Sequence, residues 1–292
     1  MLTESILMSN INELRHTGSQ ILRSAAVADA DTDASLLLQH VLGVDKNHIL
    51  AHGTDEVTES DEREYLLYLD RRKEHEPLQY ITGHQEFMGL DFEVDEHVLI
   101  PRQDTECLVE EAMIETEDGM RVLDLCTGSG CILISLMRYK NDIEGVGTDI
   151  SAQALETARR NAKALGVDAV FLEGDLYGAL KGSDKAYGQF DIIVSNPPYI
   201  ARGVIDTLME EVRAHEPLRA LDGGLDGLDF YRRIINGADE YLVPGGCILF
   251  EIGYDQGQAV SGLLKDNGYA DVRVVKDLAG LDRVVKGRRN MH

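Results

Sequence analysis

The first quarter of the chain has the hydrophobic clusters and the end signals of short helices. One cluster, residues 36–42, follows an acidic stretch and is closed by Gly43. Acidic and small polar residues begin helices and glycine ends them, so we expect a helix here. Another helix is predicted to begin near Thr58, because Thr58 and Asp61 resemble a capping box. Residues 1–75 are therefore predicted to form a small helical bundle.

After the helical part, the pattern changes to short segments that alternate between apolar and polar residues. These segments are residues 79–83 and 87–94, with Gly89 as the turn candidate. Alternation with a glycine at the turn is typical of paired strands. We interpret residues 76–100 as a β-hairpin linker between two domains.

From about residue 120 onward, short apolar runs alternate with helical segments such as residues 151–165. Regular alternation of this kind gives a parallel sheet with helices on both faces. The runs are residues 121–126, 143–149, 169–173, 190–195, 246–252, 271–275 and 283–286. Only a short connection around Gly280 joins the last two, so we expect an antiparallel edge pair, because parallel neighbours need a longer crossover. The fold class predicted for residues 101–292 is α/β.

The charge of the chain limits the partners that it can bind. The 292 residues include 28 Lys and Arg against 52 Asp and Glu, which gives a formal net charge of −24 at pH 7. An acidic surface repels phosphate backbones and anionic lipids, so we expect neither direct nucleic-acid binding nor membrane binding. Hydrophobic residues make up 43% of the chain, which is ordinary for a globular protein of one large or two smaller domains.

Targeting and metal-binding patterns are not expected in this sequence. No apolar run approaches the roughly 20 residues that span a bilayer. The first five residues carry an acid and no basic region, so a cytoplasmic protein is expected rather than a secreted one. The four cysteines form no C-x-x-C pair and the nine histidines form no H-E-x-x-H motif, so free thiols and no metal site are predicted.

A glycine-rich loop follows the first strand of the predicted sheet and leads directly into a helix. The loop consists of Cys126, Thr127, Gly128, Ser129 and Gly130. The two glycines allow a tight turn and a close approach of the backbone to a ligand at a helix N-terminus. A dinucleotide fingerprint would have a third glycine where Leu133 stands, which weakens the case for NAD. A smaller nucleoside cofactor, such as S-adenosylmethionine, remains compatible, with its methionyl carboxylate facing the loop.

Two acidic residues follow the next strands of the sheet. Asp149 lies nineteen residues beyond Gly130, where a carboxylate can accept hydrogen bonds from both hydroxyls of a ribose. The alternative is that Asp149 caps the helix that opens at Ser151, and we favour the ribose role. Asp175 is a candidate acceptor for an adenine amino group, with Leu176 against the ring. A simple turn acid is nearly as good an interpretation of Asp175.

The fourth strand of the sheet ends in a stiff loop of Asn196, Pro197, Pro198 and Tyr199. The prolines fix φ and lack backbone N–H groups, which leaves carbonyl acceptors. A planar NH2 group held by the Asn196 side-chain oxygen and the Pro197 carbonyl would aim its nitrogen at an electrophilic methyl group, such as the sulfonium methyl of S-adenosylmethionine. Tyr199 offers an aromatic face for stacking or for packing along an amide-bearing stem. The alternative is a rigid turn with a buried tyrosine.

Together with their flanking segments, these residues resemble the PrmC/HemK family, the protein-(glutamine-N5) methyltransferases that modify peptide chain release factors. The tetrapeptide alone is shared with methyltransferases that act on adenine, so the flanking segments make the resemblance specific. They are residues 76–83, 99–106, 216–217, 220–231 and 277–283. The resemblance implies a Rossmann-like class I methyltransferase domain, with a mostly parallel seven-stranded sheet and an antiparallel edge, preceded by the helical domain and the hairpin.

The resemblance also implies a reaction and its residues. The enzyme would transfer a methyl group from S-adenosylmethionine to the side-chain amide nitrogen of the glutamine in the Gly-Gly-Gln motif of class I release factors. Asn196, Pro197 and Tyr199 would be catalytic, Pro198 would contact the substrate, and Asn196 would lie against the cofactor as well. The helical domain and the hairpin would help to hold the protein partner.

Two positions depart from the family pattern, which commonly has Gly at Cys126 and Pro at Gln103. Cys126 is small and would contribute only its backbone, so little effect is expected. Gln103 follows Arg102, for which a cofactor-side role and a surface salt bridge both stay open.

Two other functions are compatible with parts of the sequence. An adenine-specific DNA or RNA methyltransferase would use the same tetrapeptide on a flipped base, but it would ordinarily carry a basic stripe. The acidic balance of this chain instead fits docking to a basic protein surface. A cofactor-binding module without chemistry is the third interpretation, and the presence of Asn196, Pro197 and Tyr199 argues against it.

Overall fold

The computed structural model describes residues 9–181 and 187–291, so the acid-bearing stretch of residues 1–5 lies outside the described part. The chain divides into two compact units. The first runs to Gly83 and also includes Glu210–His215, and the second comprises His84–Met209 and the chain from Glu216 onward. The division thus falls inside the stretch of residues 76–100 that the sequence pattern assigns to one linker.

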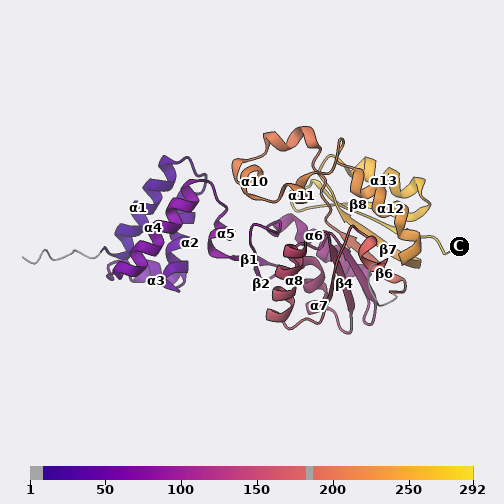
Figure 1. Ribbon diagram of the computed structural model, residues 1–292, viewed down its shortest axis with the longest axis horizontal. Helices are drawn as coiled ribbons and strands as arrows, with labels where there is room; N and C mark the ends of the chain where they lie inside the picture. Colours follow the sequence, from indigo (N-terminus) through magenta and orange to yellow (C-terminus); the bar gives the residue numbers. More distant parts are fainter. Residues whose placement is uncertain (1–8, 182–186, 292) are drawn as a thin grey trace, which may run out of the picture. The chain divides into compact units, whose positions relative to one another are not determined.

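Short helices build the first unit, as the sequence pattern predicts (Figure 1). They are α1 (Ile11–Ser24), α2 (Ala30–Leu42), α3 (Lys46–Ala51), α4 (Glu59–Lys73) and α5 (Leu78–Thr82). Helix α2 ends at Gly43, whose φ of 63° is left-handed, and α4 begins after Thr58, whose side chain accepts a hydrogen bond from the Asp61 N–H. Both predicted helix ends are therefore confirmed. At the centre, the buried Tyr65 donates its hydroxyl to the Ala34 carbonyl at 3.0 Å.

Helix α5 corrects one expectation. Residues 79–83 are predicted as an alternating strand segment, but they lie in a helix with Pro77 at its N-cap and the left-handed Gly83 at its C-cap. The neighbours Tyr80 and Ile81 are both buried. A strand with one solvated face would bury only every second residue, whereas the helix buries both of these neighbouring side chains.

The predicted hairpin follows α5 and belongs to the second unit. Strands β1 (His84–Phe87) and β2 (Leu90–Glu93) pair in antiparallel fashion. Met88 and Gly89 both have positive φ, the requirement of the tight turn that best matches strand twist, so Gly89 is confirmed as a turn residue. Phe87 and Phe92 pack edge to face in the core of this unit, with 6.0 Å between ring centroids.

A seven-stranded sheet organises the second unit. Its strands are β3 (Arg121–Leu125), β4 (Glu144–Asp149), β5 (Val170–Glu173), β6 (Phe190–Ser195), β7 (Leu242–Glu251), β8 (Tyr269–Lys276) and β9 (Asp282–Arg289). The order across the sheet is β5-β4-β3-β6-β7-β9-β8, with the first five strands parallel and β9 antiparallel to both β7 and β8. The predicted α/β fold and its antiparallel edge are confirmed. The strand order reverses direction beside β3, which has β4 on one side and β6 on the other.

Helices cover both faces of the sheet (Figure 1). One face packs against α6 (Gln103–Glu115), α7 (Cys131–Tyr139) and α8 (Ala152–Ala164). The opposite face packs against α9 (Gly178–Lys181), α12 (Asp229–Tyr241) and α13 (Gly257–Asp266). The neighbours Ile248 and Leu249 on β7 enter opposite cores, because successive strand side chains point to opposite faces. In the described ranges, we find no helix with both the length and the apolar character that a membrane span requires.

The segment after β6 contains η1 (Arg202–Thr207), α10 (Glu210–His215) and α11 (Leu218–Leu221). Helix α10 packs within the first unit, although it follows β6 in the chain. The buried Arg72 lies between two carboxylates, with its Nε 2.7 Å from Asp33 and its Nη2 2.6 Å from Glu211. A buried charge is tolerated only when it is paired, so this ion trio specifies where α10 docks. No sequence pattern pointed to this contact.

Candidate active site

A cavity of about 350 Å³ lies in the second unit at the carboxyl ends of β3, β4, β5 and β6. Open parallel sheets bind ligands at this edge, where the strand order reverses. Of the residues predicted for the site, those that line the cavity are Cys126, Thr127, Gly128, Ser129, Asp149, Asp175, Leu176, Asn196 and Pro198. The predicted residues outside its lining are Gly130, Pro197 and Tyr199.

The glycine loop has the backbone that the sequence predicts. Gly128 and Gly130 have φ of 56° and 80°, and Gly130 is the N-cap of α7. A Cβ at Gly130 would lie 2.8 Å from the Ile134 side chain, whereas at Gly128 nothing lies within 4 Å of that position. The left-handed φ favours glycine at both positions, and at Gly130 an added Cβ would also crowd the Ile134 side chain.

Cys126 has a left-handed backbone as well, with φ of 62°. The expectation that cysteine in place of glycine has little effect considered only the side chain and not the backbone conformation. L-residues pay a steric cost in this region, which explains why glycine suits the position. The thiol is free, and burial raises its pKa.

Asp149 joins the end of β4 to the glycine loop. Its Oδ2 accepts from the Gly128 N–H at 3.0 Å, and its Oδ1 accepts from the Ser151 N–H at 2.9 Å. The N-cap of α8 is Ser151, whose hydroxyl accepts from the Ala154 N–H, so the alternative role of Asp149 as the helix cap is not what the structure has. Burial raises the pKa of Asp149, and the two backbone N–H groups oppose that rise.

The far end of the cavity combines an ion pair with apolar side chains. Asp175 is bound to Arg233 at 2.6 Å and is half exposed, while Leu176 is buried. Arg233 also lies over the ring of Phe230, 5.6 Å from its centroid. Both Phe230 and Arg233 come from α12 and line the cavity, and sequence reasoning assigned neither of them a role. The adenine-binding roles of Asp175 and Leu176 stay predictions.

The loop after β6 presents Asn196 to the cavity and turns Tyr199 away from it. The Asn196 Nδ2 donates to the Thr105 hydroxyl oxygen at 3.3 Å, which leaves the side-chain oxygen Oδ1 as the acceptor. The Tyr199 hydroxyl donates to Glu251 at 3.2 Å, and the Tyr199 carbonyl accepts from Gln256 at 2.9 Å. Sequence reasoning missed Thr105, Glu251 and Gln256, because these partners lie far from the loop in the chain.

Arg102 lines the cavity and also forms an ion pair with the buried Glu216. An ion pair of Arg102 is therefore present, although its carboxylate is buried rather than at the surface, and a cofactor-side role stays a prediction. Gln103 is the first residue of α6. Proline is favoured at that position because its N–H would be unpaired anyway, which accounts for the family preference without involving the site.

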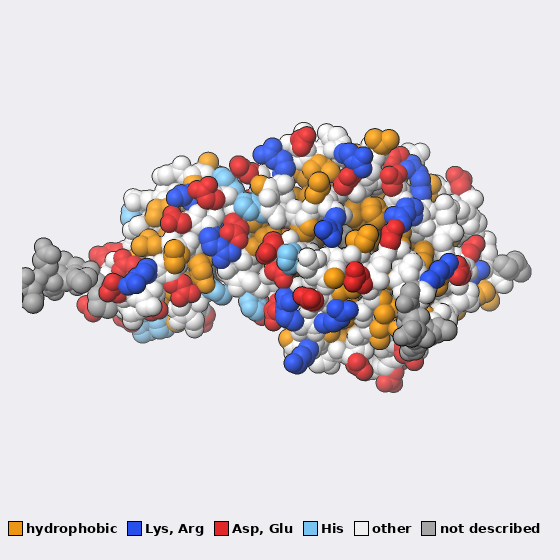
Figure 2. All heavy atoms as spheres, in the orientation of Figure 1, with side chains coloured by type: hydrophobic (Ala, Val, Ile, Leu, Met, Phe, Trp, Pro, Cys, Tyr) orange, Lys and Arg blue, Asp and Glu red, His pale blue; other side chains and the backbone are white. Residues whose placement is uncertain are grey.

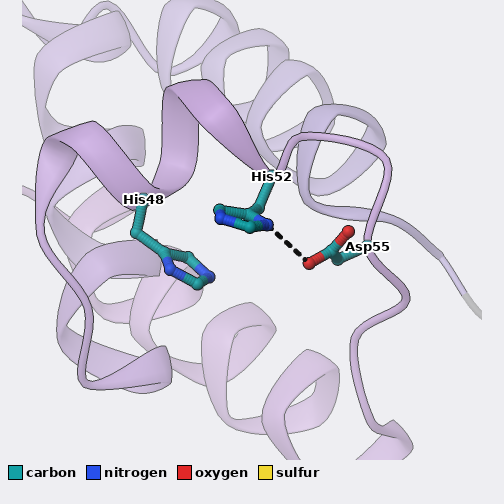
Figure 3. A group of neighbouring side chains, drawn as sticks. All are labelled: His48, His52 and Asp55. Atoms are coloured by element: carbon teal, nitrogen blue, oxygen red, sulfur yellow. Dashed lines mark hydrogen bonds and ion pairs between the residues drawn. The ribbon is translucent and has the colours of Figure 1, made fainter.

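Figure 3 shows a cluster of His48, His52 and Asp55 in the first unit, whose ligand-type atoms lie within 4.8 Å of one another. Imidazoles and carboxylates are zinc ligands. The His52 Nδ1 lies 3.1 Å from the Asp55 carboxylate, and the His48 and His52 rings stack at 4.3 Å with an interplanar angle of 19°. Because imidazole lone pairs lie in the ring plane, nearly parallel rings do not aim at one point. The expectation that the chain holds no metal stays a prediction.

Comparison with known proteins matches both units. The family model "PrmC N-terminal domain" matches residues 13–83, and the model "Methyltransferase small domain" matches residues 103–224. A release factor glutamine methyltransferase of Clostridium acetobutylicum is 43% identical over 87% of this chain and 89% of its own length. One from Clostridium botulinum is 42% identical over 96% of this chain and 99% of its own length.

Among solved structures, a methyltransferase from Pyrococcus furiosus aligns with a TM-score of 0.52. It is 18% identical and covers 80% of this chain and 100% of its own. That likeness concerns the fold alone.

Proposed function

The chain belongs to the release factor glutamine methyltransferase family, and from this membership and the site geometry we propose its reaction. The enzyme transfers a methyl group from S-adenosylmethionine to the side-chain amide nitrogen of the glutamine in the Gly-Gly-Gln motif of class I peptide chain release factors. The observation that carries the proposal is Asn196 at the cavity wall, with its Nδ2 bound to Thr105 and its Oδ1 left to accept.

The cavity fits a nucleoside cofactor of this kind. Its volume of about 350 Å³ lies within the range of ligand pockets, and the open space at Gly128 is where a Cβ would block a close approach to the loop. We infer that Gly128 and Ser129 hold the amino-acid end of the cofactor, Asp149 the ribose, and Leu176 the base. Phe230 adds an aromatic wall near Leu176.

The residues of the loop after β6 orient the acceptor. When bound, S-adenosylmethionine supplies an electrophilic methyl group on a positively charged sulfur. The Asn196 Oδ1 and the Pro197 carbonyl would each accept one N–H of the glutamine amide, which places the nitrogen and favours a localised lone pair. Fixed acceptors of this kind need no reorganisation during the reaction, so they lower the barrier.

Features around the cavity suit a protein substrate. The segment after β6 exposes large apolar side chains, with Met209 at 73%, Leu218 at 60% and Leu225 at 85% exposure. Apolar side chains that gather into one exposed patch are typical of protein-docking surfaces, and we propose that role for this segment. On the face in Figure 2, basic side chains are interspersed with acidic ones, while the chain as a whole carries −24.

The net negative charge of the chain supports docking to a basic protein surface and does not favour nucleic-acid binding. We accordingly propose that the chain methylates the release factor directly, without binding nucleic acid or a membrane. The proposed place of action is the cytoplasm, where translation termination takes place.

One incubation tests the proposal against its rival. The chain is mixed with methyl-labelled S-adenosylmethionine and either a class I release factor or adenine-containing DNA and RNA oligonucleotides, and mass spectrometry locates the label. We expect label on the glutamine of the Gly-Gly-Gln motif and none on a release factor whose motif glutamine is alanine. Label on adenine, or on the alanine variant of the release factor, would overturn the proposal.

A further inference from the structure

The first turn of α6 contains the hydrogen-bond partner of Asn196. Helix α6 begins at Gln103, and its third residue, Thr105, accepts from the Asn196 Nδ2 at 3.3 Å. The N-cap of the helix is Arg102, whose side chain has no acceptor for the N–H groups of the first turn. Helix ends fray unless a cap or another contact holds them. The position of Thr105 therefore depends on contacts that its neighbours make.

Two acidic neighbours of Thr105 anchor this turn. On one side, Glu106 accepts from the Met88 N–H at 2.7 Å, which ties the turn to the β-hairpin. On the other side, the Asp104 Oδ2 lies 3.0 Å from the Nη2 of Arg283 on β9. Because Asp104 and Thr105 are adjacent, the ion pair with Arg283 fixes the backbone that carries the Thr105 hydroxyl.

Arg283 is itself held by the turn between β8 and β9. It is 8% exposed, and its Nε and Nη2 donate to the Asp277 Oδ2 at 3.3 Å and 3.1 Å. The other oxygen of Asp277 accepts from the N–H groups of Ala279 and Leu281 at 2.9 Å and 3.0 Å. A planar guanidinium binds carboxylates in a fixed direction, which an ammonium does not. The turn of residues 277–283 therefore fixes the position of the Arg283 guanidinium.

We propose that Arg283 is a positioning residue for the acceptor loop. Through Asp104 it holds the first turn of α6, where Thr105 meets the Asn196 amide. This inference rests on the proposed function, because the direction of the Asn196 amide matters only if its Oδ1 accepts the substrate N–H. The alternative is a purely structural ion pair between β9 and α6.

The same strand and the same helix offer a matched control. Lys286 on β9 is also 8% exposed, and its Nζ donates to Glu111 at 2.6 Å and to Glu115 at 2.8 Å. Both acids lie in the second half of α6, away from Thr105. Loss of the Lys286 charge weakens the contact between β9 and α6 without releasing the first turn. A purely structural role therefore predicts the same outcome at Arg283 and Lys286, and a positioning role does not.

The first test compares R283M with K286M, since methionine keeps an apolar stem and removes the charge. With release factor as the substrate, R283M should lower kcat about tenfold, a limited loss because Glu106 still anchors the turn. The dissociation constant for S-adenosylmethionine should change less than about threefold, and K286M should keep kcat within about threefold. Normal kcat in R283M, equal kcat losses in the two variants, or a loss of cofactor affinity as large as the loss of kcat would overturn the inference.

The second test uses D104N, because Asp104 is half exposed and its substitution should leave the chain folded. D104N should lower kcat about three- to tenfold, and the R283M/D104N double variant should be no slower than R283M alone. An acid in the first turn also stabilises a helix through the helix dipole, and a loss of that kind would multiply with the loss in R283M. Multiplied losses in the double variant would therefore contradict the positioning role.

A third variant tests the path through Thr105. In a T105V background, D104N should lower kcat by less than about threefold further, because both substitutions act on the same bond to Asn196. An undiminished effect of D104N in that background would refute the path, and this pair still decides if R283M does not fold. Absence of any transfer by the unsubstituted chain to the release factor would instead refute the proposed function.

Discussion

The cofactor half and the acceptor half of the proposed active site each contain a buried carboxyl group, and the two groups are held in different ways. In the cofactor half, Asp124 on β3 accepts from Thr127, three residues further along, at 2.6 Å. In the acceptor half, Glu251 on β7 accepts from Tyr199, which lies 52 residues earlier in the chain, at 3.2 Å. Both groups have one oxygen without a partner among the described residues, and burial raises both pKa values to about 7.

This difference in construction predicts which substitutions change cofactor binding and which change turnover. The cofactor half is built within one strand-loop-helix unit, and its loop is tied to the next strand by the Gly128 N–H to Asp149 bond and the Thr127 N–H to Thr148 carbonyl bond. The acceptor half is assembled from α6, the loop after β6 and the end of β7. Substitutions in the first half should therefore change mainly cofactor affinity, and substitutions in the second half mainly kcat.

The largest expected effect is in the acceptor half. Asn196→Ala should lower kcat at least about 100-fold, the scale of losing one fixed polar group that acts in the transition state. Cofactor affinity should change less than threefold, since the side chain mainly orients the acceptor. Single-turnover kinetics and calorimetry measure the two quantities separately. Near-normal turnover by this variant would remove the acceptor role of Asn196.

The converse substitution is in the cofactor half. Asp149→Ala should weaken S-adenosylmethionine binding about 10- to 100-fold, through loss of charged hydrogen bonds worth about 1.5–3 kcal/mol. At saturating cofactor, kcat should stay within about threefold. Asp149→Asn serves as the matched control, because it keeps the size of the side chain. If calorimetry shows the same affinity for the Asp149→Ala variant and the unsubstituted chain, the carboxylate only braces the glycine loop.

The pH dependence of kcat should distinguish the buried carboxyl group of Glu251 from that of Asp124. Burial raises the pKa of Glu251 to about 7, so the carboxylate that accepts the Tyr199 hydroxyl is lost below neutrality. We expect kcat to fall by about tenfold in total as the pH drops through that value, and the break to vanish in E251Q. Asp124→Asn should keep the break, because Asp124 does not contact the acceptor loop. A break that persists in E251Q would assign the titration to another group.

The groups that face Glu251 should not blur this profile. They are Tyr199, Tyr231, Cys131, Arg283 and Asp104. Burial raises the pKa of the two tyrosines and the cysteine, which keeps them neutral near pH 7. The pKa of Arg283 is raised by Asp277, so it stays charged.

Stability should change with pH in the opposite sense to kcat. A carboxyl group whose pKa is raised on folding binds more protons in the folded state. The contribution of the protonated Glu251 to the free energy of unfolding is therefore fully present near pH 4.5 and is lost as pH rises to about 7. For a shift of this size the loss is about 3 kcal/mol, and Asp124 contributes with the same sign. Denaturant unfolding of E251Q at pH 5 and pH 8 checks the expected flattening.

The smallest expected effect is at Cys126, where φ is 62°. Cys126→Gly should be about 0.5–1 kcal/mol more stable than Cys126→Ala, since the left-handed backbone costs an L-residue more than glycine loses in unfolded-state entropy. Cys247 in β7 is the matched control, and there glycine should be less stable than alanine. Thermal unfolding measures both pairs. The same sign at the two positions would contradict the backbone explanation.

Much of the fold could be predicted because its signals are local. The helix ends at Gly43 and Thr58, the turn at Gly89 and the seven strands all follow from residues close to them in the chain. The segment of residues 79–83 was the exception, because five residues are too few to separate alternation from one helical turn. The docking of α10 could not be predicted, since its ion trio joins residues from three distant helices.

The sequence by itself predicted the backbone and the position of the proposed cofactor half of the site. Sequence spacing predicts where the strand, the glycines at 128 and 130 and the acid at 149 lie, because parallel strands end at one edge of a sheet. Only the tertiary structure decided the acceptor half. The Asn196 amide donates to Thr105 and the Tyr199 hydroxyl donates to Glu251, and hydrogen bonds between residues far apart in the chain leave no spacing to read.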